Sequence, residues 1–211
     1  MRADAVRNHR RILDAAAQLL AERGLEVTLD DIAAAADIGV GTVYRRYPNK
    51  RALVIELFVA QLDEIVDTAE AAVLDPNPWY GLTRFVELTC EMVAGNRGFA
   101  TVMTELQDGA ILFEEHRERL LPAVEALLRR GKAAGSVRPE VELADVLAVI
   151  GMVHAIAAWT GPVDPDNWRR YLIFLLNGIR TATEPELPLT TPALTEEQMN
   201  EARVALVRRR K

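Results

Sequence analysis

The 211-residue chain has a single cysteine, Cys90, three histidines and no long uninterrupted apolar run. One cysteine excludes an intramolecular disulfide and a Cys-rich zinc site. The most apolar stretch, residues 146–159, contains Gly151 and His154 and is shorter than the roughly 20 residues that a membrane span needs. The charged N-terminus lacks the apolar core of a signal peptide. We therefore expect a soluble, cytoplasmic protein with no membrane partner.

The sequence also lacks the residue patterns of common enzymes. His9, His116 and His154 form no recognisable triad, and neither a glycine-rich phosphate loop nor a metal-ligand spacing is present. The acids Glu114 and Glu115 are adjacent in sequence, so a helix would point them about 100° apart. We expect no catalytic residues, no metal and no cofactor.

Charge is divided unevenly along the chain. The formal net charge of −6 argues against blanket electrostatic binding to nucleic acid, because phosphate would repel the whole molecule. Residues 1–51 hold nine Lys or Arg and seven Asp or Glu, whereas the remaining 160 residues hold sixteen and twenty-four. This asymmetry predicts an N-terminal part whose function differs from that of the rest.

Apolar residues recur with a helical period along nearly the whole chain, and no segment shows the alternation of a strand. We therefore expect an all-α fold, with half of the residues hydrophobic and a sizeable core. The expected helices are a first one that stops at Gly24, then 28–36, 40–47, 49–74, 79–95, 98–110, 117–134, 142–160 and 166–183, and a last one after Thr195.

Residues 28–47 have the pattern of a helix-turn-helix. Thr28 and Asp31 resemble a capping box at the start of a short helix, and Asp37 and Gly39 are residue types that tolerate turn geometry. Both short helices are too short to be stable alone, so they must pack on the first helix as a unit of three.

The second of these helices has an outward face that suits DNA. At 100° per residue, Val40, Val43 and Tyr47 are predicted to face the core. The outward residues are Gly41, Thr42 and Arg45, flanked by Tyr44 and Arg46. Arginine can bind guanine O6 and N7, threonine can contact bases or phosphate, and glycine lets the backbone approach. Thr28 heads a helix whose free N–H groups can hold a phosphate, and Lys50 is placed to contact the same backbone. Taken alone, a short helix that carries arginine is more often solvated surface than a DNA-reading helix.

The segments Thr28-Leu-Asp-Asp-Ile-Ala and Ala-Asp-Ile-Gly-Val-Gly-Thr-Val-Tyr-Arg-Arg-Tyr-Pro-Asn-Lys50 resemble the TetR family of transcriptional regulators. The similarity covers about residues 9–57, and the rest matches in length and helical layout. The resemblance implies a three-helix DNA-binding unit and a larger domain that dimerises and binds a small effector. By position it implies phosphate-backbone contacts by Thr28, Thr42, Tyr44, Tyr47 and Lys50, and base contacts by Gly41 and Arg45. The chain departs from the family at Gly39, where a capping Ser is common, and at Asp37, where Gly is common.

The helix predicted over 142–160 is apolar nearly all round, which is typical of a helix buried on every side. A second subunit would cover its outer side, with small residues permitting close approach across a two-fold axis. The expected interface residues are Gly151, His154, Ala155, Ala158, Leu172, Leu175, Leu176 and Ile179. The alternative is one thick monomer core. We expect a DNA-binding domain over 1–50, an effector-binding and dimerisation domain over 51–183, and a tail over 184–211.

The effector pocket is expected on the middle helices, where adaptable Met is mixed with a few polar groups. The expected lining is Phe85, Thr89, Met92, Met103, Gln107, Met152 and Trp159, although any single one of these is more often ordinary core. The sequence thus predicts a ligand-responsive homodimeric regulator, most simply a repressor. It would bind a pseudo-palindromic double-stranded DNA operator and be released by a small-molecule effector. The alternative is an all-α scaffold or small-ligand carrier without sequence-specific DNA binding.

Overall fold

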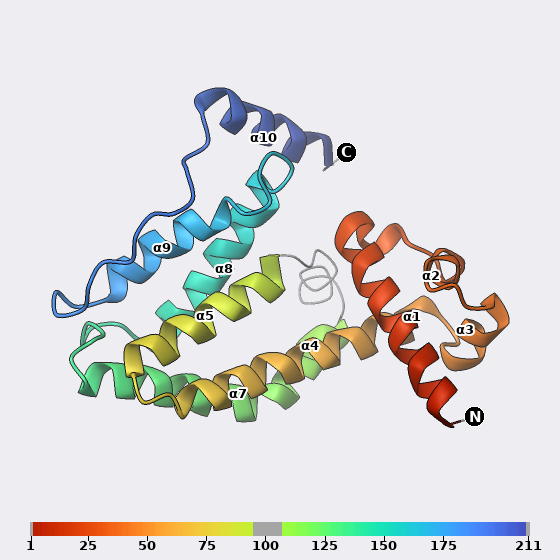
Figure 1. The fold of residues 1–211 in the computed structure, drawn as a ribbon, viewed down its shortest axis with the longest axis horizontal. Coiled ribbons are helices and arrows are strands. Elements are labelled where there is room, and N and C mark those ends of the chain that lie inside the picture. Colours follow the sequence, from red (N-terminus) through yellow and green to blue (C-terminus); the bar gives the residue numbers. More distant parts are fainter. Residues whose placement is uncertain (1, 95–106, 210–211) are drawn as a thin grey trace. The chain divides into compact units, whose positions relative to one another are not determined.

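The structure is a computed structural model that describes residues 2–94 and 107–209 (Figure 1). Within these residues it contains nine α-helices, a short 3-10 helix and no strand. One isolated antiparallel bridge joins Val137 to Arg180. The all-α prediction is confirmed, and the helix expected over 98–110 lies mostly outside the described residues.

The chain forms two compact units. Of the described residues, the first unit holds 2–64 and 107–117, and the second holds 65–94 and 118–209. Two long helices, α4 (Lys50–Val73) and α7 (Gln107–Ala133), contribute residues to both units. The first unit thus extends beyond residue 50, which the sequence predicts as the end of the DNA-binding domain.

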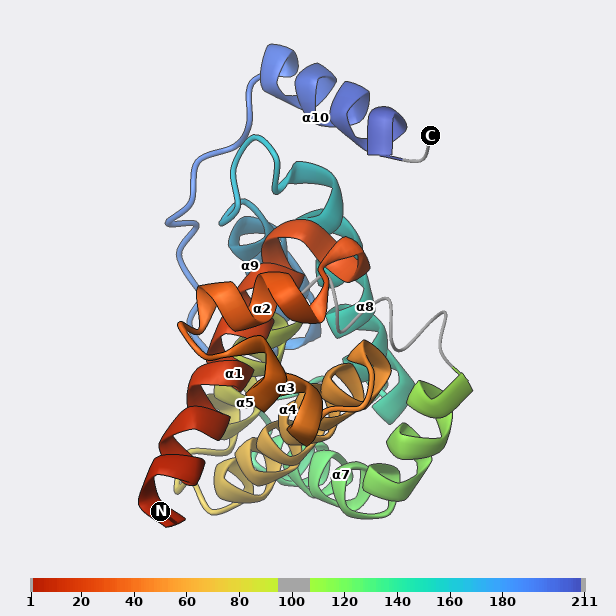
Figure 2. The same ribbon diagram turned by 90° about the vertical axis from the view of Figure 1, so that its right-hand side faces the viewer.

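The first unit is built on α1 (Arg2–Arg23), η1 (Gly24–Glu26), α2 (Leu29–Ala35) and α3 (Val40–Arg46), which Figure 2 shows together. Both short helices are packed, because α2 contacts α1 and α3 contacts α2. Their apolar residues share one core, which includes Ile12, Ala16, Leu20, Ile32 and Val43. The predicted unit of three helices is confirmed.

Local signals fix the ends of these helices. The capping box is present, since the Asp31 N–H donates to Thr28 Oγ1 over 3.1 Å and the Thr28 N–H donates to Asp31 Oδ2 over 2.9 Å. Asp37 has the left-handed φ of +50° that its residue type tolerates, and the Arg11 guanidinium donates to both its carboxylate and its carbonyl oxygen. The prediction that Val40 faces the core is wrong. Val40 is the first residue of α3 and is 44% exposed, because only Val43 and Tyr47 turn inward.

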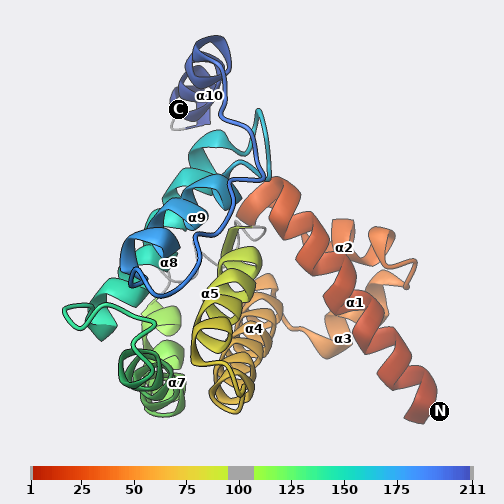
Figure 3. The ribbon, with the colours of Figure 1, turned by 60° about the vertical axis from the view of Figure 1, so that its left-hand side comes forward.

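The second unit contains α5 (Pro78–Ala94), α8 (Leu143–Thr160), α9 (Trp168–Ile179) and α10 (Glu196–Arg209). Helices α8 and α9 lie side by side (Figure 3), and α5 packs against both. Helix α9 is shorter than the range of 166–183 predicted for it. It ends before Arg180, because Arg180 forms the bridge to Val137.

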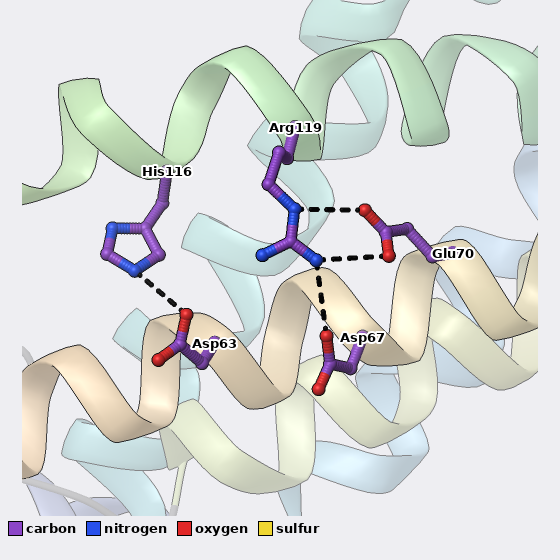
Figure 4. Close-up of polar contacts among 5 residues, drawn as sticks. All are labelled: Asp63, Asp67, Glu70, His116 and Arg119. Atoms are coloured by element: carbon purple, nitrogen blue, oxygen red, sulfur yellow. Dashed lines mark hydrogen bonds and ion pairs between the residues drawn. The ribbon is translucent and has the colours of Figure 1, made fainter.

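Two arginines of α7 tie this helix to α4 and the turn after it. Arg119 donates to both carboxylate oxygens of Glu70, each over 3.1 Å, and to Asp67 over 3.4 Å (Figure 4). Arg130 donates to the carbonyl oxygens of Val73, the last residue of α4, and of Asp75 in the turn after it. It thereby satisfies carbonyl groups that no longer have partners inside the helix.

The segment after α9 is extended and runs back along that helix to α10 (Figure 1). Asn177 binds both backbone groups of Leu187, with Nδ2 to the carbonyl oxygen over 3.0 Å and the N–H to Oδ1 over 2.9 Å. Arg170 donates to the carbonyl oxygen of Thr191 over 3.0 Å. Helix α10 begins with a capping pair between Thr195 and Gln198 and packs on α8. The extended tail and the last helix are as predicted.

Candidate nucleic-acid interface

The outward face of α3 is open and polar. Tyr44 is 48% exposed, and Arg45 and Arg46 are exposed beside it. At Gly41, a Cβ would meet no atom within 4 Å, so this point of the helix is accessible to another backbone. Arg45 donates from Nη2 to the hydroxyl of Thr42 over 3.2 Å, which leaves further guanidinium N–H groups for an outside acceptor. This face has the composition of a base-reading surface.

Two predicted phosphate contacts flank this face. The Thr28 hydroxyl is exposed but engaged in the capping box, where it also donates to Asp31 Oδ2 over 2.8 Å. The hydrogen bonds from the backbone and side chain of Thr28 lower the pKa of Asp31. Lys50 is the first residue of α4, directly after Asn49, whose Oδ1 accepts from the Ala52 N–H over 2.9 Å. Asn49 therefore caps the start of α4.

The two tyrosines of this region are in different environments. The Tyr44 hydroxyl faces Asp30, whose negative charge raises the pKa of Tyr44. The Tyr47 ring is only 2% exposed, as predicted for a core residue, and its hydroxyl lies 3.1 Å from His9 Nδ1. His9 in turn contacts Glu56. Sequence reasoning missed these two partners, because they are far apart in the chain and meet only through packing.

The residues predicted for the effector pocket differ in burial. Phe85 and Thr89 are buried on α5, and Met92 is half-buried near its end. Met152 is 46% exposed and Trp159 is half-buried, both on α8. Met103 and the side chain of Gln107 lie outside the described part of the chain.

Three buried polar atoms on α5 and α8 have no hydrogen-bond partner among the described residues. They are Thr89 Oγ1, His154 Nδ1 and Trp159 Nε1. Buried polar groups normally have partners, so each of these atoms could serve a bound molecule or an ordered water. A cavity of about 310 Å³ lies elsewhere, between α7 and the start of α8. It is lined by Glu125, Leu128, Arg129, Lys132, Glu142 and Leu143.

The outer face of α8 is apolar yet exposed. Gly151, Ala155 and Ala158 are exposed at helical spacing, next to Met152. The helix is long and apolar enough to cross a membrane, but only 28% of it is buried in this subunit. A single helix of this kind is weak support for a membrane span, since core and interface helices have the same composition.

The predicted interface residues of α9 fall into two groups, one buried and one partly exposed. Leu172 and Leu176 are 4% and 3% exposed and belong to the core of their own subunit, because α9 packs this side against α8 and α5. Leu175 and Ile179 are half-buried, and Phe174 is 48% exposed. The outward side of α9 is therefore centred nearer Phe174 than the sequence predicted.

The single cysteine has the environment of a core residue. Cys90 is 1% exposed, and burial raises the pKa of its thiol to about 12. A thiol that stays protonated is a poor nucleophile and a poor redox sensor. Among the described residues, no three His, Cys, Asp or Glu side chains gather as a metal site would require.

Two family sequence models match the chain. The one described as "Bacterial regulatory proteins, tetR family" matches residues 12–57, and the one described as "Transcriptional regulator SbtR-like, C-terminal domain" matches residues 77–181. The first range contains α2 and α3, and the second extends from the start of α5 to the end of α9. A comparison with the curated proteins gives no match.

Solved structures with a similar fold are also described as TetR-family regulators. A TetR transcription regulatory protein from Mycobacterium vanbaalenii is 28% identical with a TM-score of 0.64, over 85% of this chain and 99% of that chain. The TetR family regulator PfmR from Thermus thermophilus is 27% identical with a TM-score of 0.59, over 82% and 97%. The regulator FadR from Bacillus subtilis, solved with stearoyl-CoA, shares the fold at 20% identity and a TM-score of 0.58, over 81% and 99%.

Proposed function

Because the chain belongs to the TetR family of transcriptional regulators, we propose that it is a homodimeric repressor that binds a pseudo-palindromic operator through α3. Members of this family are DNA-binding transcription factors, not enzymes, as the sequence also led us to expect. In this proposal residues 1–50 bind DNA, residues 51–183 bind an effector and dimerise, and residues 184–211 are a tail. The protein acts in the cytoplasm, where regulators of this family are soluble.

The observation that carries the proposal is the outward face of α3. Arg45 would read bases, with Gly41 allowing close approach, and Thr42 and Tyr44 would contact the backbone. The positively charged Lys50 side chain would contact the same phosphates. These side chains stand on a packed three-helix unit, so their geometry is fixed before DNA arrives.

We assign the dimer interface to the exposed faces of α8 and α9. An apolar face of this size is rarely left in water, and small residues at Gly151, Ala155 and Ala158 let a second helix approach closely. A two-fold partner covers the same face on both subunits. The dimer would hold two copies of α3 one or two DNA turns apart, which defines the expected spacing of half-sites.

We assign the effector-binding site to the second unit, near the buried polar atoms of α5 and α8. Thr89, His154 and Trp159 would supply hydrogen bonds to an otherwise apolar molecule. Phe85 and Met92 would add apolar contact, as would Met152 beside the dimer face. The effector would release DNA by binding more tightly to a state with altered spacing of the two recognition helices.

Selection of duplexes from a random-sequence pool by mobility shift, repeated at two salt concentrations, tests this function. We expect an enriched palindrome whose affinity falls steeply with salt, because several phosphates are neutralised. Its half-site spacing measures the distance between the recognition helices. A well-folded dimer that enriches no sequence at low salt would contradict the proposal and favour a scaffold or ligand carrier.

A further inference from the structure

The first residue of α3 is a valine that neither the core nor the proposed function uses. Val40 begins this helix and is 44% exposed. Among the residues of the first unit whose side chains the structure describes, Val40 and Tyr44 are the two large hydrophobic residues that stay exposed. They are four residues apart and therefore lie on the same side of α3, with Val40 nearer the N-terminus. A single exposed valine is ordinary on a protein surface, so its position decides what it means.

The start of α3 lacks the residues that stabilise the start of α2. Helix α2 has the capping box of Thr28 and Asp31 and a second acidic residue in its first turn. At α3 the N-cap residue, Gly39, makes no side-chain hydrogen bond, and the first turn has no acidic residue. Val40 adds a β-branched residue of lower helix propensity. Local preferences are given up mainly at functional sites, so this helix start indicates a role outside its own unit.

The Val40 side chain projects from the N-terminal end of α3. The Cα–Cβ bonds of a helix tilt toward its N-terminus, so the side chain of a first residue extends toward the helix end. Gly39 and Gly41 flank it, and all three residues are exposed. Apart from chain neighbours, a Cβ at Gly41 would meet no atom within 4 Å, and one at Gly39 would meet only Thr42 Oγ1, at 4.0 Å. The Val40 isopropyl group is therefore accessible to a surface that approaches this end of the helix.

The three residues at this end have no polar side chain. Glycine and valine supply neither a donor nor an acceptor, so their side chains cannot read the polar atoms of base edges. The major groove presents one apolar group, the 5-methyl group of thymine. In a helix-turn-helix the N-terminal residues of the recognition helix contact base edges. We propose, building on the proposed DNA binding, that Val40 is a specificity-determining residue that contacts a thymine methyl group in each half-site.

Val40 and Arg45 then read different bases by different physics. Arg45 would bind guanine through hydrogen bonds, whereas Val40 recognises thymine by removing two apolar groups from water. Because the contact is made by the methyl group alone, deoxyuridine in place of thymidine removes it and leaves base pairing unchanged. Burial of one methyl group corresponds to about fourfold in affinity, and the two half-sites of a dimer together to about fifteenfold.

The test starts from the duplex that the wild-type protein selects from a random-sequence pool. Each thymidine of a half-site, together with its symmetry mate, is replaced in turn by deoxyuridine, and fluorescence anisotropy measures the affinity of the full-length protein. One replacement is expected to weaken wild-type binding by about fifteenfold. Val40→Ala is expected to bind this uracil duplex and the thymine duplex equally well. Because Val40 is exposed, the substitution leaves the core intact.

Val204→Ala is the matched control. Val204 is 41% exposed on α10, in the second unit, so the variant loses the same atoms from a comparably exposed valine. It is expected to keep the wild-type difference between the two duplexes. A scrambled duplex checks the fold of Val40→Ala. Its affinity for this duplex is expected to equal that of wild type, because phosphate contacts do not depend on Val40.

Selection repeated with Val40→Ala provides a second measurement. Its enriched sequence is expected to keep the wild-type base preferences except at the thymine, where the preference is lost. If no thymidine can be replaced with a loss of wild-type affinity, or if wild type and Val40→Ala lose affinity equally, the inference is overturned. A wild-type protein that enriches no sequence is a different result, because it removes the proposed function itself.

Discussion

Helices α3 and α8 each turn one face away from their own core, and the two faces differ in chemistry. On α3 the exposed side chains include Tyr44, Arg45 and Arg46, whereas on α8 they include Met152 and Ala155. A polar face is stable in water, so its exposure alone identifies no partner. An apolar face is less stable in water, so its exposure argues for a partner. A partner of α3 must be argued from residue types and spacing, whereas the proposed partner of α8 is argued from exposed apolar surface.

The largest expected effect comes from making the α8 face resemble the α3 face. Ala155→Arg places a cation against its own symmetry mate at the proposed two-fold contact. We expect the dimer to weaken by about 100-fold or more, because a buried like-charge pair costs several kcal/mol. Sedimentation or light scattering measures the mass. Ala133→Arg, at the exposed end of α7, is the control. If Ala155→Arg dimerises as tightly as wild type, the interface does not lie on this face of α8.

The next effect tests whether the α3 face reads sequence. Arg45→Ala is expected to lose about 1–3 kcal/mol of discrimination between the selected operator and a scrambled duplex. The loss should fall on the operator and leave the scrambled duplex nearly unchanged, because base contacts carry specificity. Titrations of both duplexes measure it. Arg129→Ala, an exposed arginine of α7, controls for the loss of one positive charge. Unchanged operator affinity would show that Arg45 is not the base-reading residue.

A smaller effect distinguishes phosphate contacts from base contacts on the same surface. Lys50→Ala is expected to weaken operator and scrambled duplex alike, by less than about tenfold. The slope of log affinity against log salt should become shallower by about 1 for each phosphate that is no longer neutralised. Titration at several salt concentrations measures the slope. Weaker binding confined to the operator would instead assign Lys50 to base reading.

The smallest effect concerns the stability of the unit that carries α3. Thr28→Ala removes the N-cap of α2 and is expected to lower the free energy of unfolding by about 1 kcal/mol, whereas Thr28→Ser should retain the cap. Chemical denaturation measures both. Equal stability of the two variants would show that the capping box contributes nothing.

The same cap predicts a pH dependence. Because Thr28 lowers the pKa of Asp31 below its ordinary 3.8 in the folded state, the stability it contributes is complete above that value. This contribution is lost as pH falls through the lowered folded pKa. The difference in stability between wild type and Thr28→Ala should therefore narrow in acid, which denaturation at about pH 7 and about pH 3 measures. A constant difference would contradict the assignment.

Local rules predicted most of the helices because their signals lie within a few residues of each other. The cap at Thr28 was found in this way, as was the turn at Asp37. Periodicity failed at Val40, where a first-turn residue has no neighbour to cover it.

Contacts between distant parts of the chain could not be predicted. The cluster of His9, Tyr47 and Glu56 forms only when α1, the end of α3 and α4 pack together, and none of the three residues is unusual in its own segment. On α9 the sequence identified the apolar stripe, but it did not show that Leu172 and Leu176 are used inside the subunit. Which side of an apolar helix faces its own core depends on the other helices.

Several of the bonds that hold the tail along α9 act on its main chain. Asn177 and Arg170 bind backbone atoms of Leu187 and Thr191, which nearly every substitution leaves in place. At these contacts the tail can therefore change its side chains without losing its path, whereas Glu186 pairs with Arg180 through its side chain. Proline at 187 is the exception, since it would remove the N–H that Asn177 accepts. Substitutions that remove these bonds should therefore be selected against at the α9 residues, and less strongly at the tail residues whose backbone they bind.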